Sequence, residues 1–171
     1  MKKEIEVKLK SAISECDSHI KKLIRGKQLL GEYFPINLDS FKGLEEDQIE
    51  HIDQFIYRFT KLQDSIGLRL LPTIFMFIEN NARTSSFLDI LNKLEKLNVL
   101  SSTADWQFFR NLRNNLAHDY PESIQQTVDT LNILFKEWPK MELIYSNAKE
   151  YYLEKIEPIL EKAGKAIDNQ D

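Results

Sequence analysis

Hydrophobic residues along the chain recur at steps of three and four positions, which is the period of an α-helix with one face turned to a core. One such segment runs from about Lys3 to Tyr33, and the most regular one begins at about Leu44 and reaches Ile66. The pattern predicts two long amphipathic helices, the second at the centre of the core. The stretch between them, residues 34–43, holds proline, asparagine, aspartate and glycine, which is typical of a turn-rich connection.

Proline and serine residues indicate where further helices begin, bend or end. Pro72 predicts a kink or a break, with the helix resuming through residues 74–78. Ser85 or Ser86 is placed to cap a helix from Phe87 to about Leu97, whose inward positions are 87, 90, 91, 94 and 97. Ser102, followed three residues later by Asp105, resembles a capping box that starts another helix.

The C-terminal third predicts a helix from Pro121, because proline fits the first position of a helix. Its inward face carries Ile124, Val128, Leu131, Leu134, Phe135 and Trp138. Pro139 is expected to bend or end this helix, and a further helix follows with another interruption at Pro158.

These segments predict an all-α, up-and-down bundle of four to six helices with long kinked members, forming a single domain over residues 1–171. No apolar run approaches the length of a membrane span, and the first residues mix charges of both signs, unlike a signal peptide. The single Cys16 excludes an internal disulfide and lies on an apolar helical stripe, so we expect a buried thiol. A cytoplasmic location is expected.

The charge balance argues against strong non-specific binding to nucleic acid. Lys and Arg number 23 against 27 Asp and Glu, so the net charge is −4, and any RNA would have to bind a local patch. The densest basic cluster comprises Lys21, Lys22, Arg25 and Lys27. It has two interpretations, a solvated helix face or a contact with an RNA backbone.

Several other chemistries have no support in the sequence. His19 and His51 lack Cys or carboxylate partners at metal-ligand spacing, and the five glycines form no phosphate-binding loop. We therefore expect neither a metal nor a cofactor.

The stretch "RNLRNNLAHDYPE", Arg110 to Glu122, concentrates residues able to act on a phosphate. Trp106, Phe109, Leu112 and Leu116 form the apolar stripe of a helix that precedes a turn at about residues 117–120. Arg113 lies toward the edge of that stripe, and His118 falls in the turn. An arginine can bind an oxyanion with two parallel hydrogen bonds, and a histidine can exchange a proton near neutral pH. The N-terminus of the following helix favours an anion at the same place.

This segment resembles the signature of HEPN-domain proteins, and it is closest to the HepT toxins. The matching residues are Arg113 and Asn114, then His118 and Tyr120, in the pattern arginine, four residues, histidine, one residue, tyrosine. The resemblance implies an all-α bundle that forms a homodimer, in which two motifs share one cleft that cuts RNA without metal. It also implies a partner, a nucleotidyltransferase antitoxin that transfers AMP to the motif tyrosine.

On this resemblance, Arg113, His118 and Asn114 are the candidate catalytic residues, and Tyr120 is the candidate AMP acceptor. Arg113 would hold the phosphate, His118 would act as base or acid, and Asn114 would orient the histidine or bind a phosphate oxygen. The substrate would be single-stranded or loop RNA, since in-line attack is hard to reach inside an A-form duplex. The alternative is a non-catalytic module that docks a nucleotidyltransferase or serves as the antitoxin of a pair. Arg110 is expected to be a solvated surface residue.

Overall fold

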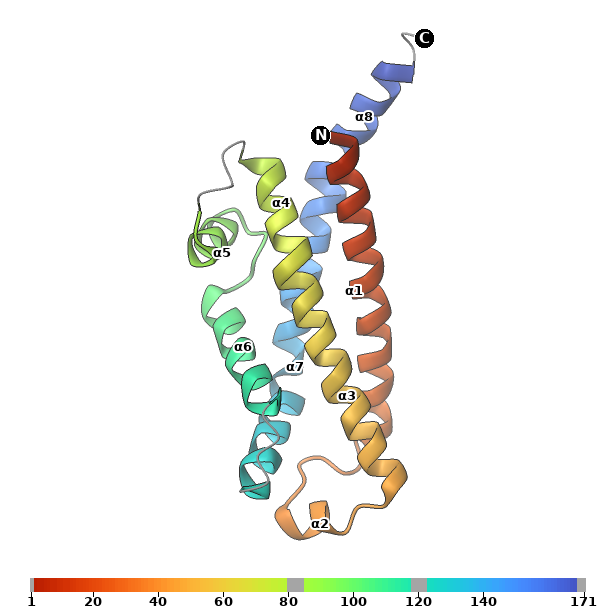
Figure 1. Cartoon of the computed structure of the whole chain (residues 1–171), viewed down its shortest axis with the longest axis vertical. Helices are drawn as coiled ribbons and strands as arrows, with labels where there is room; N and C mark the ends of the chain where they lie inside the picture. Colours follow the sequence, from red (N-terminus) through yellow and green to blue (C-terminus); the bar gives the residue numbers. More distant parts are fainter. Residues whose placement is uncertain (1, 80–84, 118–122, 169–171) are drawn as a thin grey trace. The chain divides into compact units, whose positions relative to one another are not determined.

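The structure, a computed structural model, describes residues 2–79, 85–117 and 123–168, and all regular elements within these ranges are helical (Figure 1). This confirms the predicted all-α bundle. None of the helices in these ranges is long and apolar enough to cross a membrane. The elements are α1 (Lys2–Leu30), α2 (Leu38–Lys42), α3 (Glu46–Asp64), the π-helical η1 (Ser65–Leu70), α4 (Leu71–Ile78), α5 (Phe87–Lys96), α6 (Thr103–Ala117), α7 (Ile124–Tyr151), the π-helical η3 (Tyr152–Ile156) and α8 (Glu157–Asp168).

The chain divides into two compact units. Unit 1 comprises Met1–Cys16, Asp64–Thr103 and Leu143–Asp171, and unit 2 comprises Asp17–Gln63 and Ala104–Glu142. The organisation as one domain over residues 1–171 stays a prediction. The segment that resembles the HEPN motif belongs to unit 2.

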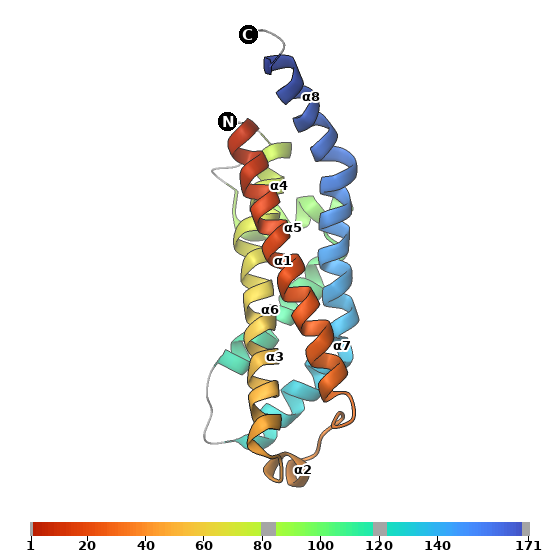
Figure 2. The same cartoon turned by 90° about the vertical axis from the view of Figure 1, so that its right-hand side faces the viewer.

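Aromatic side chains of unit 2 lie where segments of α1, α3, α6 and α7 meet. The C-terminal part of α1 lies beside α3 (Figures 1 and 2), and a Cβ added at Gly26 would come within 3.1 Å of Cδ2 of Phe55. On α3, the Phe55 ring lies 6.3 Å from that of Trp138 on α7. The Phe59 ring lies 6.1 Å from that of Phe109 on α6, edge to face. The predicted apolar faces of α3, α6 and α7 therefore share one core.

The connection between α1 and α3 contains a short helix that the sequence analysis did not predict. Asn37 caps it, because its Oδ1 accepts a hydrogen bond of 2.8 Å from the Ser40 N–H. The preceding residues are held by Asn132 on α7, whose side-chain amide accepts from the Ile36 N–H and donates to the Ile36 carbonyl, each at 2.8 Å. This stretch is therefore a fixed part of unit 2.

In unit 1, α5 packs on α4 and begins where its capping residues predict. The Ser86 side chain accepts from the Asp89 N–H while the Asp89 carboxylate accepts from the Ser86 N–H, which completes a capping box. At the other end, Asn98 adopts φ of 57°, and the Val99 N–H donates to the Leu94 carbonyl. That geometry is a Schellman motif with asparagine in the left-handed position.

The two π-helical segments both end just before a proline. In η1 the Leu71 N–H donates to the carbonyl of Ile66, five residues back, and Pro72 follows. The segment η3 ends in the same way ahead of Pro158. A wider turn relieves the clash between the proline ring and the carbonyl four residues earlier. The helix is therefore not broken at Pro72, and α7 runs through Pro139 without ending there.

Several positions predicted to face the core are exposed instead. Ile49 on α3, Leu97 after α5 and Ile124 at the start of α7 are each more than 40% exposed. All three lie in the first or last turn of a helix or just beyond it, where fewer neighbouring elements cover the apolar face. Cys16 is fully buried, as expected.

Candidate functional site

Helix α6 carries the first half of the candidate site, and its apolar face fixes the helix in unit 2. Trp106, Phe109 and Leu112 are each at most 5% exposed, as their spacing predicts. The helix begins at Thr103, whose N–H donates to the Glu95 carboxylate at 3.1 Å. The Thr103 side chain and, to a smaller extent, this N–H lower the pKa of Glu95, because both stabilise the ionised carboxylate.

Arg113 and Asn114 lie in the C-terminal part of α6, directly before the predicted turn. Arg113 is half-buried, and its Nη1 donates to Asn114 Oδ1 at 3.3 Å. Asn114 is exposed, so its remaining hydrogen-bonding capacity faces water. Of the four predicted site residues, the structure describes only Arg113 and Asn114, which are consecutive in the sequence and share this hydrogen bond.

His118 and Tyr120 lie outside the described residues, so their predicted roles stay predictions. The next helix, α7, begins at Ile124, which corrects the predicted start at Pro121. The capping residue is Ser123, whose Oγ accepts from the Gln126 N–H at 3.3 Å. Serine is among the best capping residues, and the helix begins at the residue that follows it.

The basic cluster of α1 separates into different environments. Lys22 and Arg25 line a groove between α1 and α3, together with Arg58 of α3, which the sequence analysis did not assign to a site. Lys21 does not line this groove, and the Lys27 ammonium lies 5.4 Å from the centre of the Phe135 ring. The helical period predicts that the basic residues of α1 lie near one another, but it cannot predict that Arg58 of α3 lies beside them.

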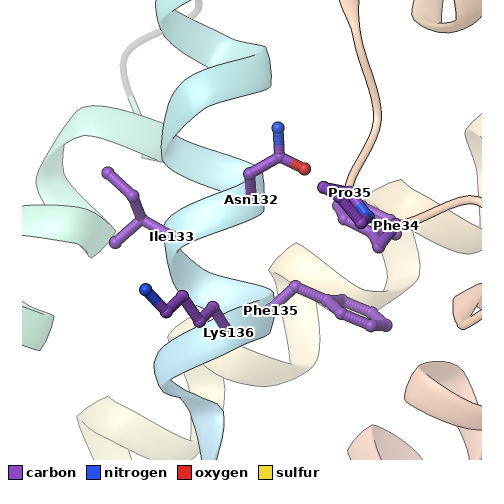
Figure 3. Close-up of a pocket in the computed structure, with 6 residues that line it drawn as sticks. All are labelled: Phe34, Pro35, Asn132, Ile133, Phe135 and Lys136. Atoms are coloured by element: carbon purple, nitrogen blue, oxygen red, sulfur yellow. The ribbon is translucent and has the colours of Figure 1, made fainter.

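A second hollow in unit 2 is almost wholly apolar. It encloses about 310 Å³ and is lined by residues of α7 and of the connection that follows α1, namely Phe34, Pro35, Asn132, Ile133, Phe135 and Lys136. Asn132 and Phe135 extend from α7 toward Phe34 and Pro35 (Figure 3). The Phe34 and Phe135 rings stack with centres 4.1 Å apart, so this hollow lies beside a packed aromatic pair.

Metal ligands do not gather in the part of the chain that the structure describes. No group of three or more His, Cys, Asp or Glu side chains there is arranged to hold a metal ion. His19 is buried and His51 is exposed on α3.

No protein-family model, curated protein or solved structure matches the chain.

Proposed function

We propose that this protein is a HepT-like HEPN toxin, an endoribonuclease that cleaves single-stranded or loop RNA without metal. The observation that carries the proposal is the pairing of Arg113 with Asn114 at the end of α6. His118 lies five residues after Arg113, and Tyr120 lies seven residues after Arg113. An arginine with a polar neighbour, followed five residues later by a histidine, supplies the anion-binding and proton-transfer groups that phosphodiester cleavage needs.

The reaction would use the 2′-hydroxyl of the RNA as the nucleophile. One His118 imidazole takes the hydroxyl proton while the 2′ oxygen bonds to the adjacent phosphorus. The bond from phosphorus to the 5′ oxygen breaks, and that oxygen receives a proton from a second imidazole. The products are a 2′,3′-cyclic phosphate and a free 5′-hydroxyl. Arg113 stabilises the negative charge that grows on the phosphate oxygens.

A homodimer would supply the two imidazoles. A single His118 cannot remove one proton and donate another in the same step, whereas two copies of the motif facing each other across a twofold axis can. The dimer is therefore part of the proposed mechanism. In this proposal the protein acts in the cytoplasm.

Tyr120 would be the point of control by a nucleotidyltransferase antitoxin. AMP on its phenol adds bulk and negative charge beside the residues that bind the RNA phosphate. Both effects oppose substrate binding, the charge because it repels a second phosphate.

The test is cleavage of a fluorescent single-stranded RNA by the purified protein in the presence of a chelator. We expect Arg113→Ala to slow cleavage by about a hundredfold or more and His118→Ala to abolish it. Arg113→Lys should restore little activity, because an ammonium lacks the planar fork of a guanidinium. Arg110→Ala is the matched control, since Arg110 is an exposed arginine one turn earlier on α6. An RNA with a single 2′-deoxy sugar at the cleaved position should resist.

Cleavage that is unchanged in both the Arg113→Ala and His118→Ala proteins would refute the proposal. Expression in a bacterial host gives a second readout, since only a nuclease should arrest growth and lose that effect on the His118→Ala substitution.

The second candidate is a non-catalytic module that docks a nucleotidyltransferase or acts as an antitoxin, and the net charge of −4 favours it. It predicts tight binding to such a partner with no cleavage of any RNA by the wild-type protein.

A further inference from the structure

The groove between α1 and α3 in unit 2 is lined on both walls by basic side chains. Lys22 and Arg25 contribute from α1, three residues apart and so on one face of the helix. His51, Gln54 and Arg58 contribute from α3 at steps of three and four residues, so they also share one face of their helix. The groove encloses about 160 Å³, and none of its lining residues is acidic.

Gly26 and Phe55, which also line the groove, explain why its two walls are close. Gly26 lies where α1 meets α3, and a Cβ there would come within 3.1 Å of the Phe55 ring. Phe55 is 3% exposed and is one of the residues that line the groove. The absence of a side chain at Gly26 therefore lets cations from two helices, 33 residues apart in sequence between Arg25 and Arg58, line one hollow.

Lys22, Arg25 and Arg58 carry the positive charge of this groove. Within the described ranges, no carboxylate forms an ion pair with Lys22, Arg25 or Arg58. Other exposed cations do form such pairs, among them Lys8 with Glu4 and Lys93 with Glu79. Three unpaired like charges around one hollow repel one another, and a bound anion would relieve that repulsion.

An exposed aromatic ring lies beside the groove. Tyr57 is 49% exposed, and the Arg58 guanidinium lies 5.2 Å from the centre of its ring. The Lys61 ammonium lies 5.8 Å from the same centre. Basic side chains that follow a backbone, next to an aromatic ring on which a base can stack, are the features that bind single-stranded nucleic acid.

We infer that the α1–α3 groove binds the sugar-phosphate backbone of single-stranded RNA, with Lys22, Arg25 and Arg58 holding phosphates and Tyr57 stacking on a base. The inference rests on the proposed function for the choice of RNA as the polymer, but binding in the groove requires no cleavage. Arg58 and Tyr57 are binding residues in this account, and neither belongs to the motif around Arg113.

The test measures binding of a fluorescent 2′-O-methyl RNA, which cannot be cleaved through its 2′ oxygen, as a function of salt concentration. The Arg25→Gln/Arg58→Gln protein should bind on the order of tenfold more weakly at about 0.1 M salt. The slope of log affinity against log salt should fall in magnitude by about 1.4, since each phosphate contact on a single strand contributes about 0.7. The matched control, Lys21→Gln/Lys42→Gln, removes the same charge at exposed positions outside the groove and should change the slope little.

Two single substitutions separate the parts of the site. Gln54→Glu keeps the size of the side chain and places a carboxylate in the groove, so it should weaken binding, whereas Gln28→Glu on the exposed surface of α1 should not. Tyr57→Ala should weaken binding about fivefold or more and leave the salt slope unchanged, because a stacked base carries no charge.

The outcomes distinguish this inference from the proposed function. Groove variants that bind as the wild type does, or lose no more affinity than their controls, would overturn the inference even if the Arg113→Ala protein loses cleavage. Displacement of the RNA by inorganic phosphate at an equal concentration of phosphate groups would also overturn it, since the groove would then be a site for small anions. A groove that binds RNA in a protein without cleavage activity would uphold the inference and refute the nuclease proposal.

Discussion

Asn132 on α7 holds the connection after α1 through both hydrogen-bonding groups of its side chain. Its Oδ1 accepts from the Ile36 N–H and its Nδ2 donates to the Ile36 carbonyl, both at 2.8 Å. Ile36 is 4% exposed, so water has little access to these backbone groups. Removal of the amide would leave one donor and one acceptor without their partner.

Substitution Asn132→Ala should therefore lower the free energy of unfolding. Each buried group left unsatisfied costs about 1 to 3 kcal/mol, and the two together should cost about 2 to 4 kcal/mol because the contact is only part-buried. With a urea dependence of roughly 2 kcal/mol per molar for a domain of this size, the midpoint should fall by about 1 to 2 M.

Substitution Asn132→Asp tests whether the hydrogen bond donated to the Ile36 carbonyl contributes to stability. One oxygen still accepts from the Ile36 N–H, but the other faces the Ile36 carbonyl and can donate only when protonated. The folded state therefore raises the pKa of the introduced carboxyl above its unfolded value of about 3.9. The free energy of unfolding of this variant should be close to that of the wild type at about pH 4. It should fall as the pH rises toward the raised pKa, because the folded state binds the proton more tightly than the unfolded state does.

The assay is urea unfolding followed by circular dichroism at pH 4 and pH 7. Asn92→Ala, at an exposed position of α5, is the control and should shift the midpoint by little. A loss below about 0.5 kcal/mol for Asn132→Ala, or an Asn132→Asp protein whose deficit does not grow with pH, would show that the amide does not hold the connection.

Three further predictions concern other parts of the chain. Asn98→Gly should raise the free energy of unfolding by a few tenths of a kcal/mol or leave it unchanged, and Asn98→Val should lower it by about 1 to 2 kcal/mol, since φ is 57° there; thermal unfolding of both proteins checks this. Burial and the hydrogen bond to Glu157 raise the pKa of Tyr152 above 10.0, so the wild type should lose stability relative to Tyr152→Phe above about pH 10, which unfolding at pH 8 and pH 11 would reveal. Under the proposed function, Arg113→Ala should reduce kcat by about a hundredfold or more, whereas Arg110→Ala should retain most activity in the same RNA cleavage assay.

Local patterns in the sequence were sufficient to locate five of the helices, but they did not indicate the short α2 or the observed start of α7. The three- and four-residue spacing of apolar residues located α1, α3, α5, α6 and α7, because that spacing depends only on neighbours within one or two turns. The cap at Ser86 was readable for the same reason, since its partner Asp89 is three residues away. The pairing of Arg113 with Asn114 also lies within one turn, and the motif that they begin was apparent from sequence alone.

Contacts between segments that are distant in the sequence determine the features that local patterns did not predict. The bonds from Asn132 to Ile36 join positions 96 residues apart, so no local spacing indicates them. The groove partner of Arg25 is Arg58 on another helix, and only the packing of α1 on α3 places them together. Packing also left Leu97 exposed although its spacing matched the inward face. A repeat along one helix specifies which residues share a face, but the other elements of the fold determine what that face meets.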